Sequence, residues 1–290
     1  MNDNNYTLLE NHIDILSFRD LADSTVATYT SYMKTYIEWT EKNIPNKNLE
    51  DVSWEEIRSY LRYLKDIKGL NPRTVNVHIA QLRDFYYYVL HKDWDRREVP
   101  FLNFDEHLPR VPSIEQVNAI IDSIKNPKHK AEIALLYSSG IRVGELTRLY
   151  CHDIKRDKMN IYIACSKNRS DRFAILSNNA LKDLEDYVRA SYRGAKPDDF
   201  LFPGQKRNTH ISKESVRQVF VNVLNRLGLS GMGFTLHSLR HAFGLHLYEA
   251  GVDLMSIKEA LGHKSLSSTA VYVSLGIGNG RRVTSPYDFK

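Results

Sequence analysis

Three prolines, Pro100, Pro109 and Pro112, interrupt a chain whose apolar residues otherwise recur mostly at helical spacing. Proline fixes the backbone φ angle and lacks an N–H donor, so a helix cannot continue through this stretch. A chain of 290 residues is also long enough for two hydrophobic cores. We therefore predict an N-terminal domain over residues 1–98, a linker over 99–112 and a second domain over 113–275. A C-terminal tail is predicted over residues 276–290.

The first domain is predicted to be helical. Ser24 precedes apolar residues at near-helical spacing and is expected to cap their helix. Ser53 and Glu56 form a capping-box pattern in front of a second helix. The pair Asn71-Pro72 is typical of the start of a third helix. The tyrosines of these helices are expected to pack in the core.

The second domain is predicted to combine helices with one small sheet. Ser113 and Gln116 form a further capping-box pattern. Residues 159–163 alternate in polarity and are rich in strand formers, and residues 173–175 are their expected partner. The expected helices cover residues 129–139, 178–192, 212–227, 236–250, 253–261 and 267–275. The fold class is thus mainly α, with a small antiparallel β-sheet in the C-terminal domain.

Charge is distributed unevenly between the two domains. Residues 1–110 carry 14 basic and 18 acidic side chains, whereas the rest of the chain carries 26 basic and 17 acidic ones. A basic excess in the second domain suits a polyanionic partner such as DNA. A mildly basic soluble surface explains the same totals equally well.

Composition argues against a membrane or secreted protein. No stretch approaches the roughly 18 apolar residues that span a bilayer, and the polar start Met1-Asn2-Asp3 has no signal-peptide pattern. The two cysteines, Cys151 and Cys165, form no CxxC pair. A cytoplasmic, reduced protein is expected.

Arg142 is a candidate phosphate-binding residue. It follows Gly140, which is expected to end a helix, and it stands where the next helix begins. Free backbone N–H groups and the positive end of the helix dipole favour anions there, and a guanidinium matches phosphate oxygens. Glu145 would lie on the same face and orient Arg142. The alternative is an ordinary surface ion pair between these two residues.

His237, Arg240 and His241 are spaced so that one helix face carries all three. Two imidazoles and a guanidinium could therefore meet on one phosphate. Metal binding by the histidines is disfavoured, because there is no HExxH glutamate and no cysteine or carboxylate set to complete a site. A helix-capping role for His237, with Arg240 in solvent, is the remaining alternative.

Three more residues complete the candidate site. Lys167 lies in the predicted β-turn, from which a lysine can protonate a leaving oxygen. His263 follows Leu261-Gly262, and Tyr272 comes nine residues later on the next short helix. A phenol is a poor nucleophile at neutral pH, since its pKa is about 10, but surrounding cations would activate it.

The order and spacing of these residues resemble the tyrosine recombinases, also called the phage integrase family. That family has an arginine in a Gly–hydrophobic–Arg–x–x–Glu–Leu context and a lysine on a β-hairpin. It also has His-x-x-Arg-His, Leu-Gly-His and a tyrosine about nine residues later. The matching positions are Arg142, Lys167, His237, Arg240, His263 and Tyr272. The resemblance covers roughly residues 113–275 in detail and, in outline, the N-terminal helices as a core-binding (SAM-like) domain.

The resemblance implies a fold, a reaction and partners. The two domains would form a C-shaped clamp around double-stranded DNA with an inverted-repeat core site. Tyr272 would attack the scissile phosphate, giving a 3′-phosphotyrosyl link and a free 5′-hydroxyl. Arg142 and Arg240 would clamp the nonbridging oxygens, Lys167 would protonate the 5′-oxygen, and His237 and His263 would donate hydrogen bonds or relay the tyrosine proton. No metal or cofactor is implied. Monomers or dimers would assemble as a homotetramer on paired sites, with accessory proteins left unspecified.

Some positions depart from the family pattern. Ser166 and Asn168 flank Lys167 where glycines are common, and Ile175 replaces a common proline. Arg169 and Arg172 therefore compete with Lys167 for the role of acid. The tail, with Gly276, Gly278, Gly280 and Pro286, does not favour the helix that many relatives dock onto a neighbouring subunit.

Several functions are compatible with this resemblance. The expected one is site-specific recombination for integration, excision or resolution of a mobile element or circular replicon, carried out near the nucleoid. A Xer-type chromosome-dimer resolvase is the alternative within the family. A type IB topoisomerase shares the chemistry without pairing sites, and a non-enzymatic DNA-binding protein would share only the fold.

Overall fold

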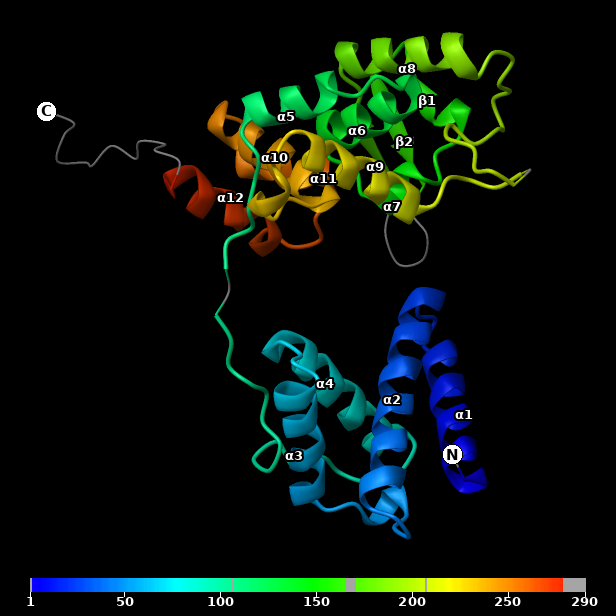
Figure 1. The fold of residues 1–290 in the computed structure, drawn as a ribbon, viewed down its shortest axis with the longest axis vertical. Coiled ribbons are helices and arrows are strands. Elements are labelled where there is room, and N and C mark those ends of the chain that lie inside the picture. Colours follow the sequence, from blue (N-terminus) through cyan, green and yellow to red (C-terminus); the bar gives the residue numbers. More distant parts are fainter. Residues whose placement is uncertain (1, 106, 165–170, 207, 279–290) are drawn as a thin grey trace, which may run out of the picture. The chain divides into compact units, whose positions relative to one another are not determined.

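The structure of the protein is a computed structural model that describes residues 2–105, 107–164, 171–206 and 208–278. The chain divides into two compact units, unit 1 (residues 1–106) and unit 2 (residues 107–290). Both are built mainly from helices, and the one sheet of the described residues belongs to unit 2 (Figure 1). The predicted fold class, mainly α with a small antiparallel sheet, is confirmed.

Unit 1 is a helical domain. Its helices are α1 (Asp3–Phe18), α2 (Asp23–Asn43), α3 (Trp54–Arg62), which a π-helical turn extends over Tyr63–Ile67, and α4 (Pro72–Tyr88). The capping box of Ser53 and Glu56 is present, and Asn71 caps α4 as predicted. The predicted cap at Ser24 is wrong, because α2 begins at Asp23 and its N-cap Ala22 makes no side-chain bond.

Several tyrosines are buried in the core of unit 1. Tyr36, Tyr60 and Tyr86 are each at most 2% exposed, as expected for core residues. The hydroxyls of Tyr36 and Tyr86 form a hydrogen bond, with their oxygens 3.0 Å apart. Neither buried polar group is therefore left unpaired, which would destabilise the fold.

The segment after α4 lies along that helix. Asn76 accepts a hydrogen bond from the Leu102 N–H at 2.7 Å and donates one to the Leu102 carbonyl at 2.9 Å. The guanidinium of Arg83 lies over the ring of Phe101. The predicted linker range, 99–112, is therefore divided between the two units, and its first part belongs to unit 1.

Unit 2 starts with the helices that position Arg142. The predicted capping box of Ser113 and Gln116 is present at the start of α5. The helices of this part are α5 (Ile114–Asp122), α6 (Pro127–Ser139) and α7 (Val143–Leu146). Helix α6 is largely buried and packs against α8, α9 and α10, so it forms the centre of the core.

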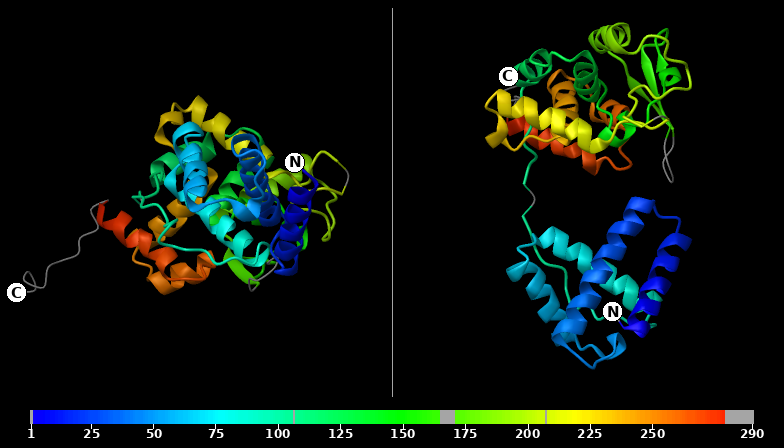
Figure 2. Two further views of the ribbon diagram at one scale, coloured as in Figure 1. Left: turned by 90° about the horizontal axis from the view of Figure 1, so that it is seen from below. Right: turned by 45° about the vertical axis from the view of Figure 1, so that its right-hand side comes forward.

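The sheet follows α7 in the sequence. It has three antiparallel strands in the order β1-β2-β3, formed by Ile154–Lys155, Asn160–Ile163 and Arg172–Ile175. Ile161 pairs with Ala174, and Ile163 pairs with Arg172, so these four side chains share one face of the sheet. This face points into the unit, because Ile161, Ile163 and Ala174 are at most 2% exposed. The sheet lies toward one end of unit 2 (Figure 2). Helix α11 contacts strand β3.

The remaining helices complete unit 2. They are α8 (Asn178–Ser191), α9 (Lys213–Arg226), α10 (Leu236–Glu249), α11 (Leu254–Leu261) and α12 (Ser267–Gly278). Each lies within about three residues of its predicted range. None of the described helices combines the length and the apolar character needed to cross a bilayer.

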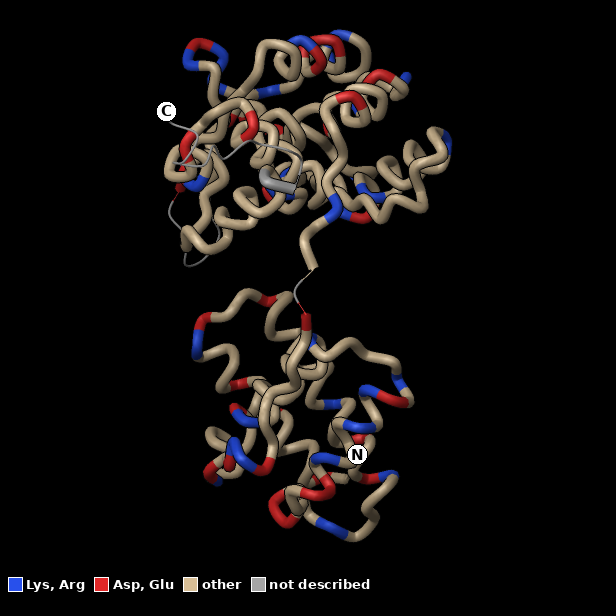
Figure 3. The backbone as a smooth tube through the Cα atoms, turned by 90° about the vertical axis from the view of Figure 1, so that its left-hand side faces the viewer, with Lys and Arg blue, Asp and Glu red and all other residues tan. Residues whose placement is uncertain are grey.

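Acidic and basic residues are interspersed along the backbone of both units (Figure 3). The net charges of the two parts therefore arise from small local differences rather than from one block of a single sign.

Candidate active site

Arg142 is held at the junction between α6 and α7. Gly140 ends α6 with φ of +61°, a left-handed conformation that favours glycine. Arg142 is the N-cap residue of α7, and its backbone N–H donates to Glu145 Oε2 at 2.7 Å. Its Nη1 donates to Glu145 Oε1 at 3.0 Å. The predicted contact between Arg142 and Glu145 is present.

The carboxylate of Glu145 also holds a second arginine. Nη1 and Nη2 of Arg172 donate to its two oxygens at 3.0 and 2.9 Å. Burial would raise the pKa of Glu145, but the hydrogen bonds from Arg172 and Arg142 lower it to about 2. Glu145 is therefore ionised throughout the neutral range, and it links strand β3 to α7.

This arrangement bears on the choice between Lys167, Arg169 and Arg172. Both terminal nitrogens of Arg172 are engaged by Glu145, and its Nε is buried without a partner in the part of the chain that the structure describes. Arg172 thus binds the Glu145 carboxylate, and its terminal nitrogens are not available to protonate a leaving oxygen. Lys167 and Arg169 lie outside the described residues.

Arg240 is buried at the centre of the site. Thr235 caps α10, so His237 is not the cap, and Arg240 is only 2% exposed, which contradicts the alternative with Arg240 in solvent. Its Nη1 donates to the Gly140 carbonyl and its Nη2 to the Leu261 carbonyl. The guanidinium of Arg240 therefore links α10 to the C-terminal ends of α6 and α11.

Histidines surround this guanidinium. The rings of His237 and His241 are perpendicular, with centroids 4.7 Å apart, on the predicted common face of α10. Burial, followed by the neighbouring cations, lowers the pKa of His241 and His263 to about 4. Both are thus neutral at pH 7. No three His, Cys, Asp or Glu side chains of the described ranges are grouped as metal ligands.

His263 and Tyr272 come from the turn before α12 and from α12 itself. Gly262, with φ of +62°, ends α11, and His263 Nδ1 lies 2.9 Å from Thr269 Oγ1. Tyr272 is fully buried, and its ring centroid is 6.1 Å from that of His241. Burial raises the pKa of Tyr272 to about 12, although the charge of Arg240 opposes the shift. Its hydroxyl has no hydrogen-bond partner among the described residues.

The structure thus brings five of the six predicted residues into one region, and the sixth, Lys167, is not described. Sequence reasoning missed two supporting residues, Thr269 and Gly244. Thr269 stands three positions before Tyr272 and so shares its helix face. Gly244 stands inside a helix, where glycine is unfavourable without a packing reason, and a Cβ atom built there would lie 2.4 Å from Tyr272 Cζ.

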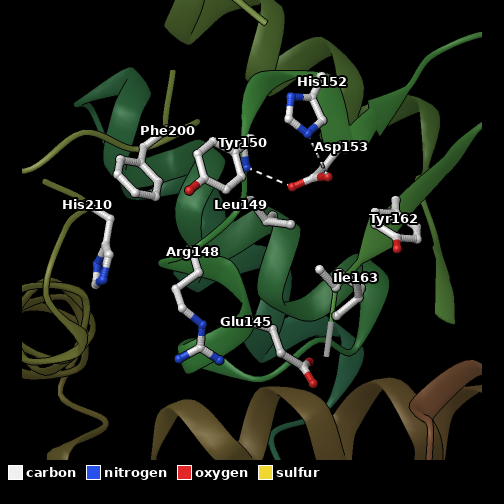
Figure 4. Close-up of a pocket in the computed structure, with 11 residues that line it drawn as sticks. Glu145, Arg148, Leu149, Tyr150, His152, Asp153, Tyr162, Ile163, Phe200 and His210 are labelled. Carbon is white, nitrogen blue, oxygen red and sulfur yellow. Dashed lines mark hydrogen bonds and ion pairs between the residues drawn. The ribbon is translucent and has the colours of Figure 1, made fainter. Parts of the chain in front are cut away.

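A pocket with a volume of about 450 Å³ lies beside Glu145 (Figure 4). Stacked rings line it: Tyr150 lies 4.7 Å from Phe200 and 5.4 Å from His152, measured between centroids. Arg148 borders the same pocket. No sequence pattern predicts this pocket, because the ring stack joins residues about fifty positions apart.

Comparisons with known proteins identify two family matches. The family described as "Phage integrase family" matches residues 113–276, and "Phage integrase, N-terminal SAM-like domain" matches residues 8–96. Among curated proteins, a putative integrase/recombinase y4qK of Sinorhizobium fredii is 34% identical over 235 residues, covering 81% of this chain and 75% of the relative. The tyrosine recombinase XerD of Oceanobacillus iheyensis is 29% identical over 271 residues, 88% of each chain.

Solved structures share the fold at lower identity. The XerH site-specific recombinase in a post-cleavage complex with palindromic difH substrate has a TM-score of 0.74 at 20% identity, covering 90% of this chain and 79% of that one. The Tn1549 transposon integrase with circular intermediate DNA has a TM-score of 0.73 at 18% identity, covering 91% and 94%.

Proposed function

The chain belongs to the phage integrase family of tyrosine recombinases, and we propose on this basis that it is a site-specific DNA recombinase acting through a 3′-phosphotyrosine intermediate. The observation that carries the proposal is the convergence, at the junctions of α6, α7, α10, α11 and α12, of Arg142, Arg240, His237, His263 and Tyr272. These residues come from distant parts of the sequence, yet all lie near one buried guanidinium.

The reaction is a phosphoryl transfer with built-in cations. The phenolic oxygen of Tyr272 forms a bond to the scissile phosphorus as the bond from phosphorus to the 5′-oxygen breaks. Arg142 and Arg240 stabilise the nonbridging oxygens, where negative charge develops. Lys167 protonates the departing 5′-oxygen, and His237 and His263 donate hydrogen bonds to the phosphate or relay the phenolic proton. Religation reverses these steps, so no nucleotide cofactor is needed.

Glu145 supports this chemistry indirectly. Its carboxylate fixes Arg142 through a backbone and a side-chain hydrogen bond. Because Arg172 holds the same carboxylate, the position of Arg142 depends on strand β3. A preorganised guanidinium loses little conformational entropy when the phosphate arrives.

The proposed partner is double-stranded DNA, and the proposed assembly is a homotetramer on two paired core sites with inverted repeats, formed from monomers or dimers. Relatives solved with DNA support the first part, including the XerH complex with difH and a lambda integrase dimer bound to a core site. The protein would act in the cytoplasm, at the nucleoid.

The biological role has two candidates. The similarity to putative integrases and to the Tn1549 transposon integrase supports a mobile element or circular replicon. The similarity to XerD supports chromosome-dimer resolution. Mapping the DNA bound by the protein in its host distinguishes them: a site at the ends of a mobile element supports the first role, and a single chromosomal site supports the second.

The reaction itself is tested with a nicked suicide substrate that carries the mapped site. Cleavage releases a short 5′-hydroxyl fragment, so a covalent protein–DNA adduct accumulates and Tyr272 is identified by mass spectrometry of its peptide. Recombinant junctions from a substrate with two sites then separate a recombinase from a type IB topoisomerase. A protein that binds DNA without any adduct would be a non-enzymatic member of the fold.

A further inference from the structure

Gly244 lies in the interior of α10, eight residues after its start at Leu236. Glycine is among the poorest helix formers, and its backbone at this position is not in the left-handed region. The helix itself therefore gives no reason for a glycine here. Another group must require the space that a side chain would fill.

That group is the ring of Tyr272. A Cβ atom built at position 244 would lie 2.4 Å from Tyr272 Cζ, 2.5 Å from Cε2 and 2.8 Å from the hydroxyl oxygen. These distances are far below van der Waals contact, and an aromatic ring cannot bend away as a flexible side chain can. The Tyr272 ring thus occupies the place of a side chain on α10.

In this position the hydroxyl is withdrawn from solvent. Tyr272 has no exposed surface, and its oxygen has no hydrogen-bond partner among the described residues, although Arg240 and His241 are nearby. An oxygen that water cannot reach cannot contact a phosphate of bound DNA either. The ring must move before it can attack.

We propose that Gly244 is a positioning residue that holds the nucleophile Tyr272 withdrawn against α10, and that the ring leaves this contact before DNA cleavage. The proposal rests on the assignment of Tyr272 as nucleophile. It adds a two-state equilibrium in which the contact with Gly244 favours the withdrawn state. Anything that fills the space at position 244 shifts the equilibrium toward the released state.

The first test measures this equilibrium without DNA. Gly244→Ala introduces the clashing methyl group, and Gly231→Ala is the control, since nothing lies within 4 Å of the Cβ position of Gly231. Both proteins and the wild type are nitrated with tetranitromethane, and each tyrosine is quantified by peptide mass spectrometry. Tyr187, 2% exposed, reports on intact folding, and Tyr87, 59% exposed, gives the rate for an accessible ring.

Nitration of Tyr272 should be at least about fivefold faster in Gly244→Ala than in the wild type, because release exposes the ring and eases ionisation of the phenol. The rates at Tyr187 and those in Gly231→Ala should not change. An unchanged rate at Tyr272 in a folded Gly244→Ala protein would overturn the proposal. The assay needs no DNA, so its outcome does not depend on recombinase activity.

A second measurement covers the case in which Gly244→Ala unfolds. In a Tyr272→Ala background the clash is gone, and replacing glycine by alanine in a helix should raise Tm by roughly 2–4 °C. In the presence of the Tyr272 ring, the same substitution should give no rise. Equal Tm shifts in the two backgrounds would show that the ring and Gly244 are not coupled.

The covalent adduct provides the functional readout. If the withdrawn state limits cleavage, Gly244→Ala should form the adduct with the suicide substrate faster than the wild type at saturating DNA. A slower adduct accompanied by faster nitration would show that Gly244 guides the ring to the phosphate rather than withholding it. Failure of the wild type to form any adduct would refute the proposed function but leave the nitration result intact.

Discussion

Glu145 binds Arg172 through both of its carboxylate oxygens, at 3.0 and 2.9 Å, and it orients Arg142 with the same two oxygens. The Glu145 and Arg172 side chains are only 9% and 11% exposed, so the pair is weakly screened by solvent. The ion pair joins β3 to the helix that carries a catalytic candidate. We therefore expect the ion pair to contribute to both stability and activity.

We expect this ion pair to make the stability of the protein sensitive to acid. The pKa of Glu145 is lowered in the folded protein to about 2, from an ordinary value of 4.5. Its stabilising effect is complete above pH 4.5 and is lost as the pH falls toward 2. The loss in the free energy of unfolding should be about 3 kcal/mol. Urea titrations between pH 2 and 6 measure it.

Glu145→Gln should lack this part of the pH dependence. It should also cleave DNA more slowly than the wild type, by roughly tenfold to a hundredfold, because Arg142 is less firmly held. DNA binding should change little. Identical acid profiles for Glu145→Gln and the wild type would show that the carboxylate is not ion-paired in solution.

Glu132 on α6 should have the opposite pH dependence. It is fully buried, neither of its carboxylate oxygens has a partner among the described residues, and burial raises its pKa to about 7. The folded protein then keeps a proton that the unfolded chain releases near pH 4.5. Stability should fall by about 3 kcal/mol as the pH rises from 4.5 to 7.

Glu132→Gln removes the proton equilibrium and nearly preserves the shape of the side chain. We expect it to be more stable than the wild type at pH 8 and similar at pH 4.5, by the same urea titrations. Glu259→Gln, at an exposed position, should keep the wild-type profile. A Glu132→Gln protein that is less stable than the wild type at pH 8 would indicate that the carboxylate has a partner in solution.

Local patterns explain how much of this fold could be predicted from the sequence. The boxes at Ser53 and Ser113 lie within four residues of their partners, so the sequence alone identifies them. Helix α1 was not predicted separately. Its buried face includes Asn5 and His12, and such polar residues interrupt the apolar stripe that marks a helix.

Contacts between distant residues explain what could not be predicted in the site. Motif spacing indicated Arg142, Arg240 and Tyr272, but not the burial of Arg240 and Tyr272. Arg240 is bound by carbonyls 100 and 21 positions away, and Arg172 is bound by a glutamate 27 positions away. No local pattern encodes these pairs. The withdrawn Tyr272 likewise depends on Gly244, which belongs to another helix.

Tyr272→Phe should abolish the covalent adduct and leave the protein at least as stable as the wild type. The buried hydroxyl makes no hydrogen bond among the described residues, so its removal breaks no interaction and relieves the cost of burying a polar atom. Thermal unfolding and the suicide substrate measure the two effects. An adduct formed by Tyr272→Phe would assign the nucleophile to another residue.

Strand cleavage should be independent of divalent metals. In the proposed mechanism, Arg142, Arg240 and Lys167 supply the positive charge that metal ions provide in many other phosphoryl transferases. Adduct formation with the suicide substrate should therefore proceed at the same rate in excess EDTA as in magnesium. A rate that falls in EDTA and recovers on addition of magnesium would require a different mechanism.

Arg240 is expected to be structural as well as catalytic. Arg240→Ala leaves the carbonyls of Gly140 and Leu261 without their donor, at the point where α6 and α11 end. The free energy of unfolding should fall by about 2–4 kcal/mol, and cleavage should be lost. Arg217→Ala is the matched control for stability, because Arg217 is exposed and pairs with Glu214 on the surface of α9; its cost should stay below about 1 kcal/mol.

Arg240→Lys separates the two roles of this residue. A lysine retains the positive charge, but its single ammonium group cannot reproduce the guanidinium fork that reaches both carbonyls. We expect stability between that of Arg240→Ala and the wild type, with cleavage still strongly reduced. Wild-type stability in Arg240→Ala, measured by urea unfolding at pH 7, would show that the two carbonyls find other donors. In that case Arg240 would act only in binding the phosphate and not in stabilising the fold.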